Sequence, residues 1–145
     1  MPGLTVLVVG GGGREHALCL GLAASPSIGS IHSAPGNAGT SMVGINHTVS
    51  TSDIEELISL AAELEADLVV VGPEVPLVNG LADSLRTAGI ACFGPHAEGA
   101  MLEGSKLHAK RVMQELGIPT GGCLVVEEAG AIEAALDSFK PPWVV

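Results

Sequence analysis

Charged and aromatic residues are both scarce in this 145-residue chain. Charged side chains make up 15% of the residues, aromatic side chains 2%, and tyrosine is absent. Six basic residues stand against 16 acidic ones, which gives a formal net charge of −10 and leaves no basic patch for a polyanion. Because base stacking also needs aromatic rings, the composition argues against nucleic acid as a partner.

Long apolar runs are also missing, although 47% of the residues are hydrophobic. Gly, Pro or a charged residue interrupts each apolar stretch before the roughly 20 residues that a membrane-spanning helix needs. The first apolar run has no basic segment before it and leads into glycines, unlike a secretory signal. We therefore expect a cytoplasmic protein with no membrane partner.

Cysteine is limited to Cys19, Cys92 and Cys123, an odd number without the CxxC spacing of a metal clip. The HExxH, G-x-S-x-G and Walker A patterns are lacking as well, and the five histidines do not cluster at ligand spacing. We expect no metal site in this chain, and cysteines that are buried in a reducing compartment.

Apolar, β-branched segments alternate with amphipathic ones along the first two thirds of the chain. The expected strands are 4–9, 28–34, 45–49, 67–71 and 90–93. The expected helices are 14–24, 54–64 with a capping box of Ser52 and Glu55, and 77–88 before Gly89. This alternation predicts an α/β fold, in which a parallel sheet carries helices on both faces.

The remainder of the chain differs in character, because residues 96–114 alone gather half of the six basic residues. We expect one helical stretch over 96–114, with Lys110 and Arg111 solvated. A strand over 122–126 and a helix near 128–139 should follow, and 143–145 resembles a strand that is cut off as it begins.

Four expected strands end in Gly or Pro turns, at 10–13, 35–36, 72–73 and 94–95. The carboxyl ends of parallel strands share one edge of the sheet, which is where open α/β sheets bind ligands. Glycines between a strand and a helix let backbone N–H groups approach a phosphate or carboxylate closely. The alternative is a flexible turn with surplus glycines.

A dinucleotide cofactor does not suit this loop. The G-x-G-x-x-G fingerprint requires glycine where Glu15 or His16 stands, depending on the register. The acid that holds the ribose diol, about 20 residues further on, is also missing, because residues 17–52 contain no Asp or Glu. A nicotinamide-dependent oxidoreductase is therefore disfavoured.

Five short motifs then occur in a set order: GGGGREHAL at 10–18, APGNAGT at 34–40, VGPEVPL at 71–77, FGP at 93–95 and LEGSK at 102–106. Together they resemble the amino-terminal part of the phosphoribosylamine-glycine ligase family, ATP-grasp enzymes of purine biosynthesis also called glycinamide ribonucleotide synthetases. The resemblance spans the whole chain. Gly11 is a departure, since the family often has Ser there, but it leaves the turn chemistry intact.

The resemblance implies two domains: a Rossmann-like pre-ATP-grasp domain over 1–101, and the truncated start of an ATP-grasp domain over 102–145. It implies a ligase that joins glycine to 5-phosphoribosylamine through a glycyl phosphate, with ATP and Mg (or Mn) as cofactors. Catalytic residues are expected beyond Val145, in the rest of the ligase or in fused purine enzymes. This chain alone should bind the phosphoribosyl substrate without turnover. The alternative is a non-catalytic phosphoribosyl-binding module or remnant, if the chain truly ends at Val145.

The expected site residues combine backbone donors, charged side chains and turn residues. The resemblance implies substrate binding by Gly12, Gly13, Arg14, Glu15, His16, Asn37, Gly72, Pro73 and Glu74, and ATP binding by Lys106. The Arg14 guanidinium suits phosphate or ribose oxygens, and Glu74 could accept hydrogen bonds from hydroxyls or an amine. A salt bridge between Arg14 and Glu15, and an ordinary exposed turn at Glu74, are the alternatives. Lys106 lies in the first turn of its helix, where a cation calls for a nearby anion.

Overall fold

The computed structural model describes residues 3–143, so Val144 and Val145 of the expected terminal strand lie outside the described residues. The chain divides into two compact units, Met1–Gly104 and Ser105–Val145. Among the described residues, no helix is both long and apolar enough to cross a membrane.

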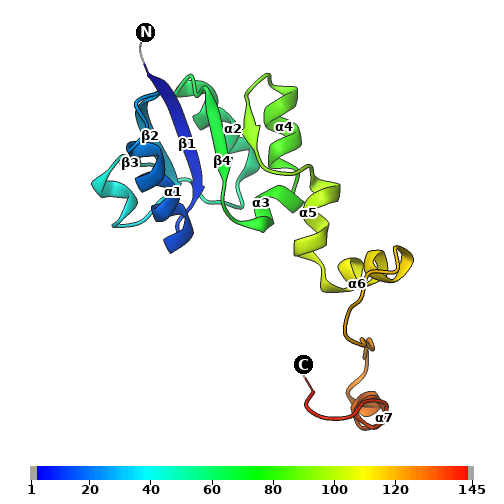
Figure 1. Ribbon diagram of the computed structural model, residues 1–145. Helices are drawn as coiled ribbons and strands as arrows, with labels where there is room; N and C mark the ends of the chain where they lie inside the picture. The colour runs from blue at the N-terminus through cyan, green and yellow to red at the C-terminus, as the bar shows by residue number, and fades with distance from the viewer. Residues whose placement is uncertain (1–2, 144–145) are drawn as a thin grey trace. The chain divides into compact units, whose positions relative to one another are not determined.

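The first unit is built on a parallel sheet of five strands in the order β3-β2-β1-β4-β5 (Figure 1). The strands are β1 (Leu4–Gly10), β2 (Ile28–Pro35), β3 (Ile45–Asn46), β4 (Leu68–Val71) and β5 (Cys92–Phe93). Each neighbouring pair is parallel. β1 is central because its side chains are apolar on both faces, and four consecutive residues, Val6 to Val9, are completely buried.

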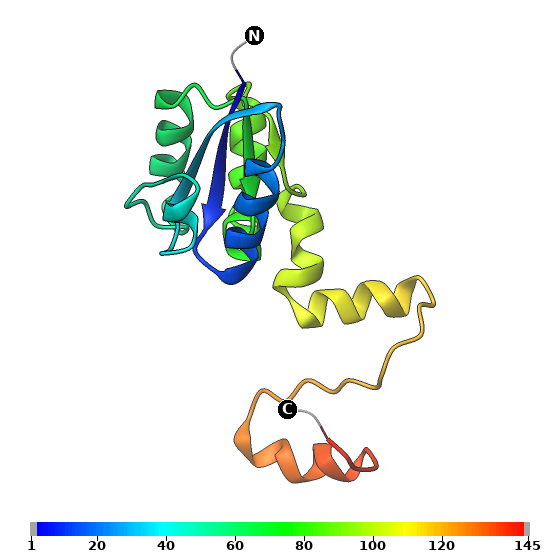
Figure 2. The ribbon, with the colours of Figure 1, turned by 60° about the vertical axis from the view of Figure 1, so that its left-hand side comes forward.

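Helices cover both faces of the sheet, as the alternation predicts. Leu7 and Val9 of β1 pack into one apolar cluster with residues of α2 (Ile54–Glu63) and α4 (Leu81–Thr87). Val6 and Val8 pack on the other face with Cys19 of α1 (Gly13–Ala23). Figure 2 shows α1 and α2 on opposite sides of the strands. This confirms the α/β fold class.

Two expected helices are each broken in two. The stretch expected over 77–88 forms α3 (Glu74–Val78) and α4, and Gly80 between them adopts a φ of +86°, which favours glycine. The stretch expected over 96–114 forms α5 (Ala97–Gly104) and α6 (Lys106–Glu115). The second helix begins afresh because the Ser105 side chain accepts a hydrogen bond from the backbone N–H of His108, at 3.2 Å.

The cap of α2 is one residue later than the capping box predicts. Asp53 is the N-cap, and its Oδ1 accepts a hydrogen bond from the backbone N–H of Glu56 at 3.0 Å. Ser52 instead pairs its hydroxyl with that of Ser50, at 2.8 Å. The prediction failed because adjacent Ser and Asp residues are equally good caps, so the sequence alone does not decide between them.

The expected strand over 122–126 is wrong. Leu124 and Val125 are 51% and 53% exposed, and no strand is assigned to the described part of the second unit, so these residues have no partner for a ladder. The expected helix near 128–139 is a 3-10 turn, η2 (Ala129–Ala131), followed by α7 (Ile132–Asp137). Lys110 is not simply solvated, because its Nζ donates to Thr120 Oγ1 at 2.6 Å and to the Gly121 carbonyl at 2.7 Å.

The three cysteines are free thiols that differ in exposure. Cys19 is buried as expected, whereas Cys92 is only partly buried and Cys123 is exposed. The pKa of the Cys92 thiol is raised, mainly because burial disfavours the charged thiolate. The expectation of three buried cysteines therefore holds for Cys19 alone.

Candidate functional site

The carboxyl edge of the sheet brings three loops together around the end of β1. The strand order turns at this point, because the chain continues from β1 to β2 on one side and later places β4 on the other. The Gly36 N–H donates to the Gly10 carbonyl at 3.0 Å, and the Gly72 N–H donates to the Val9 carbonyl at 3.0 Å. The glycine loop is thus flanked on both sides, at the position where open α/β sheets form their ligand crevice.

Glu15 points back from the first turn of α1 into this loop. Its Oε2 accepts a hydrogen bond from the backbone N–H of Gly12 at 2.6 Å, which satisfies one free donor of the helix terminus. The residue is 4% exposed. Its other oxygen, Oε1, is buried and has no hydrogen-bond partner among the described residues.

Three glycines make room for this carboxylate. A Cβ atom on Gly10 would lie 2.6 Å from the Glu15 Cγ, and one on Gly12 would lie 2.9 Å from Oε2. A Cβ atom on Gly72, after β4, would overlap Oε1. The sequence suggests that the glycines admit a ligand, but at these three positions they admit an internal side chain. Gly13 has no atom within 4 Å of its Cβ position, so its backbone lies open.

Asn37 ties the β2 loop to the glycine loop. Its Nδ2 donates to the carbonyls of Gly11 and Gly12, both at 3.0 Å. Its Oδ1 accepts from the N–H groups of Gly39 at 2.7 Å and Thr40 at 3.0 Å. Since an amide has two donors and two acceptor lone pairs, this side chain is fully used within the protein.

Thr40 and Asn46 complete the same network, and sequence reasoning missed both. The buried Thr40 hydroxyl accepts from the Asn37 N–H at 2.7 Å, and Asn46 Nδ2 donates to the Asn37 carbonyl at 2.8 Å. The signal for Thr40 was present, because an Asn three residues before a Thr in a Pro-Gly-Asn turn suits side-chain-to-backbone bonding. His16 packs its ring against Gly39, where a Cβ atom would overlap Nδ1.

Arg14 lies at the mouth of the loop with its side chain 58% exposed. Its Nε is 3.3 Å from Glu15 Oε1, so the salt bridge considered from the sequence is present. Its two Nη groups have no hydrogen-bond or ion-pair partner within residues 3–143. They are free to meet phosphate or ribose oxygens.

Glu74 begins α3 directly after Pro73, which is the N-cap of that helix. It lines a cavity of about 150 Å³ together with Val75 and Val78 of α3, the C-cap residue Asn79, and Glu103 and Gly104 of α5. Within the described chain no hydrogen bond or ion pair joins Glu74 to the glycine loop. The structure thus brings Gly72 to the loop, while Glu74 stands at a neighbouring cavity of the same unit.

Lys106 belongs to the second unit, where it is the exposed first residue of α6. Among residues 3–143, no three His, Cys, Asp or Glu side chains gather in a way that could hold a metal ion. The described residues therefore hold no preformed cluster of protein ligands for magnesium.

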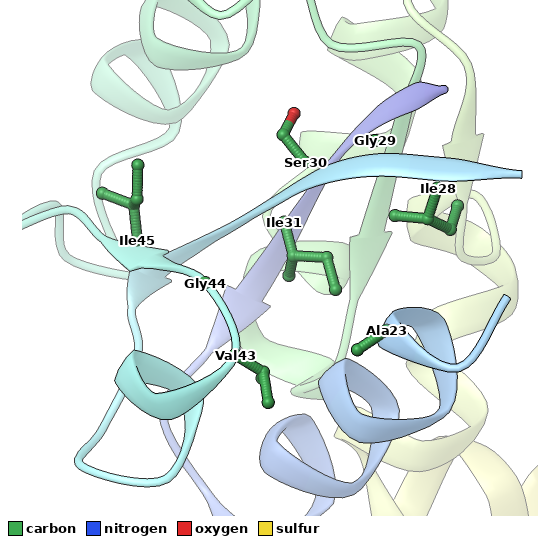
Figure 3. A pocket seen from close by; sticks show the side chains of 8 residues that line it. All are labelled: Ala23, Ile28, Gly29, Ser30, Ile31, Val43, Gly44 and Ile45. Atoms are coloured by element: carbon green, nitrogen blue, oxygen red, sulfur yellow. The ribbon is translucent and has the colours of Figure 1, made fainter. Parts of the chain in front are cut away.

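Another cavity of the first unit, of about 340 Å³, is lined by residues outside the glycine loop. Figure 3 shows Val43 on one side of it, Ala23 at the end of α1 on the other, and Ile31 of β2 between them. Its lining contains no titratable side chain and none of the expected site residues. We do not assign substrate binding to it.

A second polar network, which the sequence did not reveal, holds the turn after β5. Asp83 of α4 bonds to the His96 ring, and its Oδ2 accepts from the Ala97 N–H at 2.8 Å. The hydrogen bond from His96 is the main cause that lowers the pKa of Asp83. Arg86 donates to the Gly94 carbonyl at 2.6 Å, so α4 fixes the Gly94 turn from two sides.

Comparison with known proteins adds the family. Residues 4–103 match the family described as phosphoribosylglycinamide synthetase, N domain. The chain belongs to this family. The segment that matches this N-domain family contains the glycine loop, the Asn37 loop and the turn at Gly72.

Named relatives of this N domain include the phosphoribosylamine-glycine ligases of Mycobacterium bovis and Streptomyces coelicolor. The first is 48% identical over 147 residues, covering 98% of this chain and 35% of the relative. The second is 50% identical over 142 residues, covering 98% of this chain and 34% of the relative. The chain thus spans about a third of the length of these relatives.

Solved structures share the fold of this N domain. The phosphoribosylamine-glycine ligase of Thermotoga maritima superposes with a TM-score of 0.67 at 34% identity, over 96% of this chain and 32% of that one. The N5-carboxyaminoimidazole ribonucleotide synthetase of Thermus thermophilus superposes with a TM-score of 0.70 at 24% identity, over 94% of this chain and 37% of that one. The second likeness concerns the fold alone.

Proposed function

We propose that this chain forms the amino-terminal part of a phosphoribosylamine-glycine ligase and holds its phosphoribosyl substrate. The whole reaction would join glycine to 5-phosphoribosylamine with hydrolysis of ATP, through a glycyl phosphate, to give glycinamide ribonucleotide. ATP and Mg (or Mn) would bind mainly to segments of the ligase outside this chain, and Lys106 would contribute to ATP binding. The cytoplasm is the expected compartment, and the rest of the ligase or fused purine enzymes are the expected partners.

One observation carries the proposal for the binding site. The exposed guanidinium of Arg14 and the open backbone of Gly13 lie together at the carboxyl edge, in a chain that is 48% identical to a named ligase over 98% of its length. Arginine presents a planar fork of donors that matches phosphate oxygens. On a protein of net charge −10, such a local group of donors offsets the general repulsion of an anionic substrate.

The remaining expected residues take different parts in this proposal. Gly12, Gly13 and His16 belong to the loop that receives the substrate, while Asn37 shapes that loop from the β2 side. In this proposal Gly72 and Pro73 border the loop from the β4 side, and Glu74, at the neighbouring cavity, would accept hydrogen bonds from substrate hydroxyls. We also propose that residues 1–101 form a substrate-binding domain and that residues 102–145 form the start of an ATP-grasp domain.

A chimaeric enzyme tests the proposal. This chain would replace the matching segment of the Streptomyces coelicolor ligase, to which it is 50% identical. We expect ATP- and glycine-dependent release of phosphate on addition of 5-phosphoribosylamine. We expect Arg14→Ala in the chimaera to raise the KM for 5-phosphoribosylamine without altering that for glycine. A folded chimaera whose phosphoribosylamine KM ignores Arg14 would contradict the assignment of the site.

A further inference from the structure

The Glu15 carboxylate occupies the place where an anion would be expected to bind. Helix N-termini at the switch point of α/β sheets usually present their free N–H groups to phosphate. Here the Gly12 N–H is already bonded to Glu15 Oε2, at 2.6 Å. The residue is only 4% exposed, so water screens its charge poorly.

The second oxygen of this carboxylate is the unusual feature. Oε1 is buried and accepts no hydrogen bond from the described residues, so an ion pair is its remaining polar contact among them. Its nearest cationic atom is the Arg14 Nε, at 3.3 Å. Because Gly10, Gly12 and Gly72 enclose the side chain, Glu15 has no room to swing away from an incoming ligand.

A second negative charge at this position would therefore meet a fixed one. Like charges brought together in a site from which water is largely excluded repel each other strongly, and this repulsion opposes the attraction that a helix N-terminus exerts on an anion. The repulsion outweighs the attraction. A free phosphate or pyrophosphate should thus be rejected at the N-cap of α1.

We propose that Glu15 is a specificity-determining residue, which excludes free phosphate and pyrophosphate from the N-terminus of α1 and directs the phosphate of a phosphorylated sugar outward to Arg14. The ion pair to Glu15 engages the Nε of Arg14, so both Nη groups remain available for a phosphate on a side chain that is 58% exposed. This inference rests on the proposed function, because it divides that same site into a crevice closed to anions and an outer phosphate position.

The test compares two probes, ribose 5-phosphate and inorganic pyrophosphate, on the ¹⁵N-labelled chain by NMR. In the wild type, ribose 5-phosphate should shift the Gly13 and Arg14 amides, whereas pyrophosphate at the same concentration should leave the Gly12 amide in place. In Glu15→Gln, which keeps the shape and removes the charge, the affinity for pyrophosphate should rise about tenfold. Glu55→Gln is the matched control, because it removes an exposed acid from the first turn of α2 and should change neither affinity.

The readout is the ratio of the two affinities, which a merely structural role would leave unchanged. A fall of about tenfold in the preference for ribose 5-phosphate in Glu15→Gln supports the proposal. If Glu15→Gln weakens both probes equally, Glu15 only supports the loop and the proposal is overturned. Should that variant fail to fold, the wild type still decides, because pyrophosphate binding at Gly12 as tight as that of ribose 5-phosphate refutes exclusion.

The failure of the proposed function would look different. In that case ribose 5-phosphate would leave the wild-type loop unshifted, while the gain in pyrophosphate affinity of Glu15→Gln would still report on the buried charge. The two claims can therefore fail separately.

Discussion

Replacement of Gly72 by alanine tests the packing of the glycine loop against Glu15. The new Cβ would overlap Oε1 and lie 2.6 Å from the Glu15 Cδ, so the carboxylate must move. Movement breaks its hydrogen bond to the Gly12 N–H, worth about 1.5–3 kcal/mol for a charged group. Overpacking adds about 1–3 kcal/mol. We expect Gly72→Ala to lower the free energy of unfolding by about 3 kcal/mol in urea denaturation.

Two controls separate this clash from a general effect of alanine. Gly21 lies within α1 and has no atom within 4 Å of its Cβ position, so Gly21→Ala should stabilise the chain by about 0.5–1 kcal/mol. In a Glu15→Ala background the obstacle is gone, and the cost of Gly72→Ala should fall below about 1 kcal/mol. An equal cost in both backgrounds would refute the claim that Gly72 exists to admit Glu15.

Three further predictions concern the loop network, a histidine pair and the outer cation. Asn37→Ala removes both bonds to glycine-loop carbonyls, and should cost about 2 kcal/mol of unfolding free energy in urea, whereas less than about 0.5 kcal/mol would show that the loops hold without it. His32 Nδ1 lies 2.9 Å from His47 Nε2, and burial, then His47, lowers the pKa of His32 from its ordinary 6.5. The unfolded chain therefore binds the proton first, and stability should fall as the pH drops from 7.5 through 6.5; a His32→Asn variant with the same slope would contradict this. Arg14→Ala should weaken ribose 5-phosphate binding by about 2–3 kcal/mol in calorimetry. Because the Arg14 side chain is 58% exposed, the urea midpoint should hardly change, and a large loss of stability would assign Arg14 a structural role instead.

The sheet could be predicted because its signals are local. β1 is a run of apolar β-branched residues that ends in glycine, and the structure places it in the centre with both faces buried. The breaks at Gly80 and Ser105 escaped prediction, since helical periodicity continues across both. The strand expected over 122–126 failed because a ladder needs a partner, which its own sequence cannot supply.

The meeting of the loops at one edge of the sheet was predictable, and the contacts between them were less so. The order of Gly and Pro turns located the carboxyl edge correctly. The contact between Glu15 and Gly72 joins segments that are remote in sequence, so no local pattern reveals that Gly72 accommodates a carboxylate. For the same reason the sequence suggested that the Asn37 side chain is available to a ligand. Its amide is instead hydrogen-bonded to the glycine loop and to its own loop after β2.

The claim that the glycine loop holds a phosphoribosyl group is central, and one titration tests it most directly. Ribose 5-phosphate would be added to the ¹⁵N-labelled wild-type chain, with ribose as the control that lacks the phosphate. We predict saturable shifts centred on Gly13 and Arg14, lost in Arg14→Ala, and much weaker shifts with ribose. Shifts that gather instead around the apolar cavity of Ile31 and Val43, or none at all, would contradict the account.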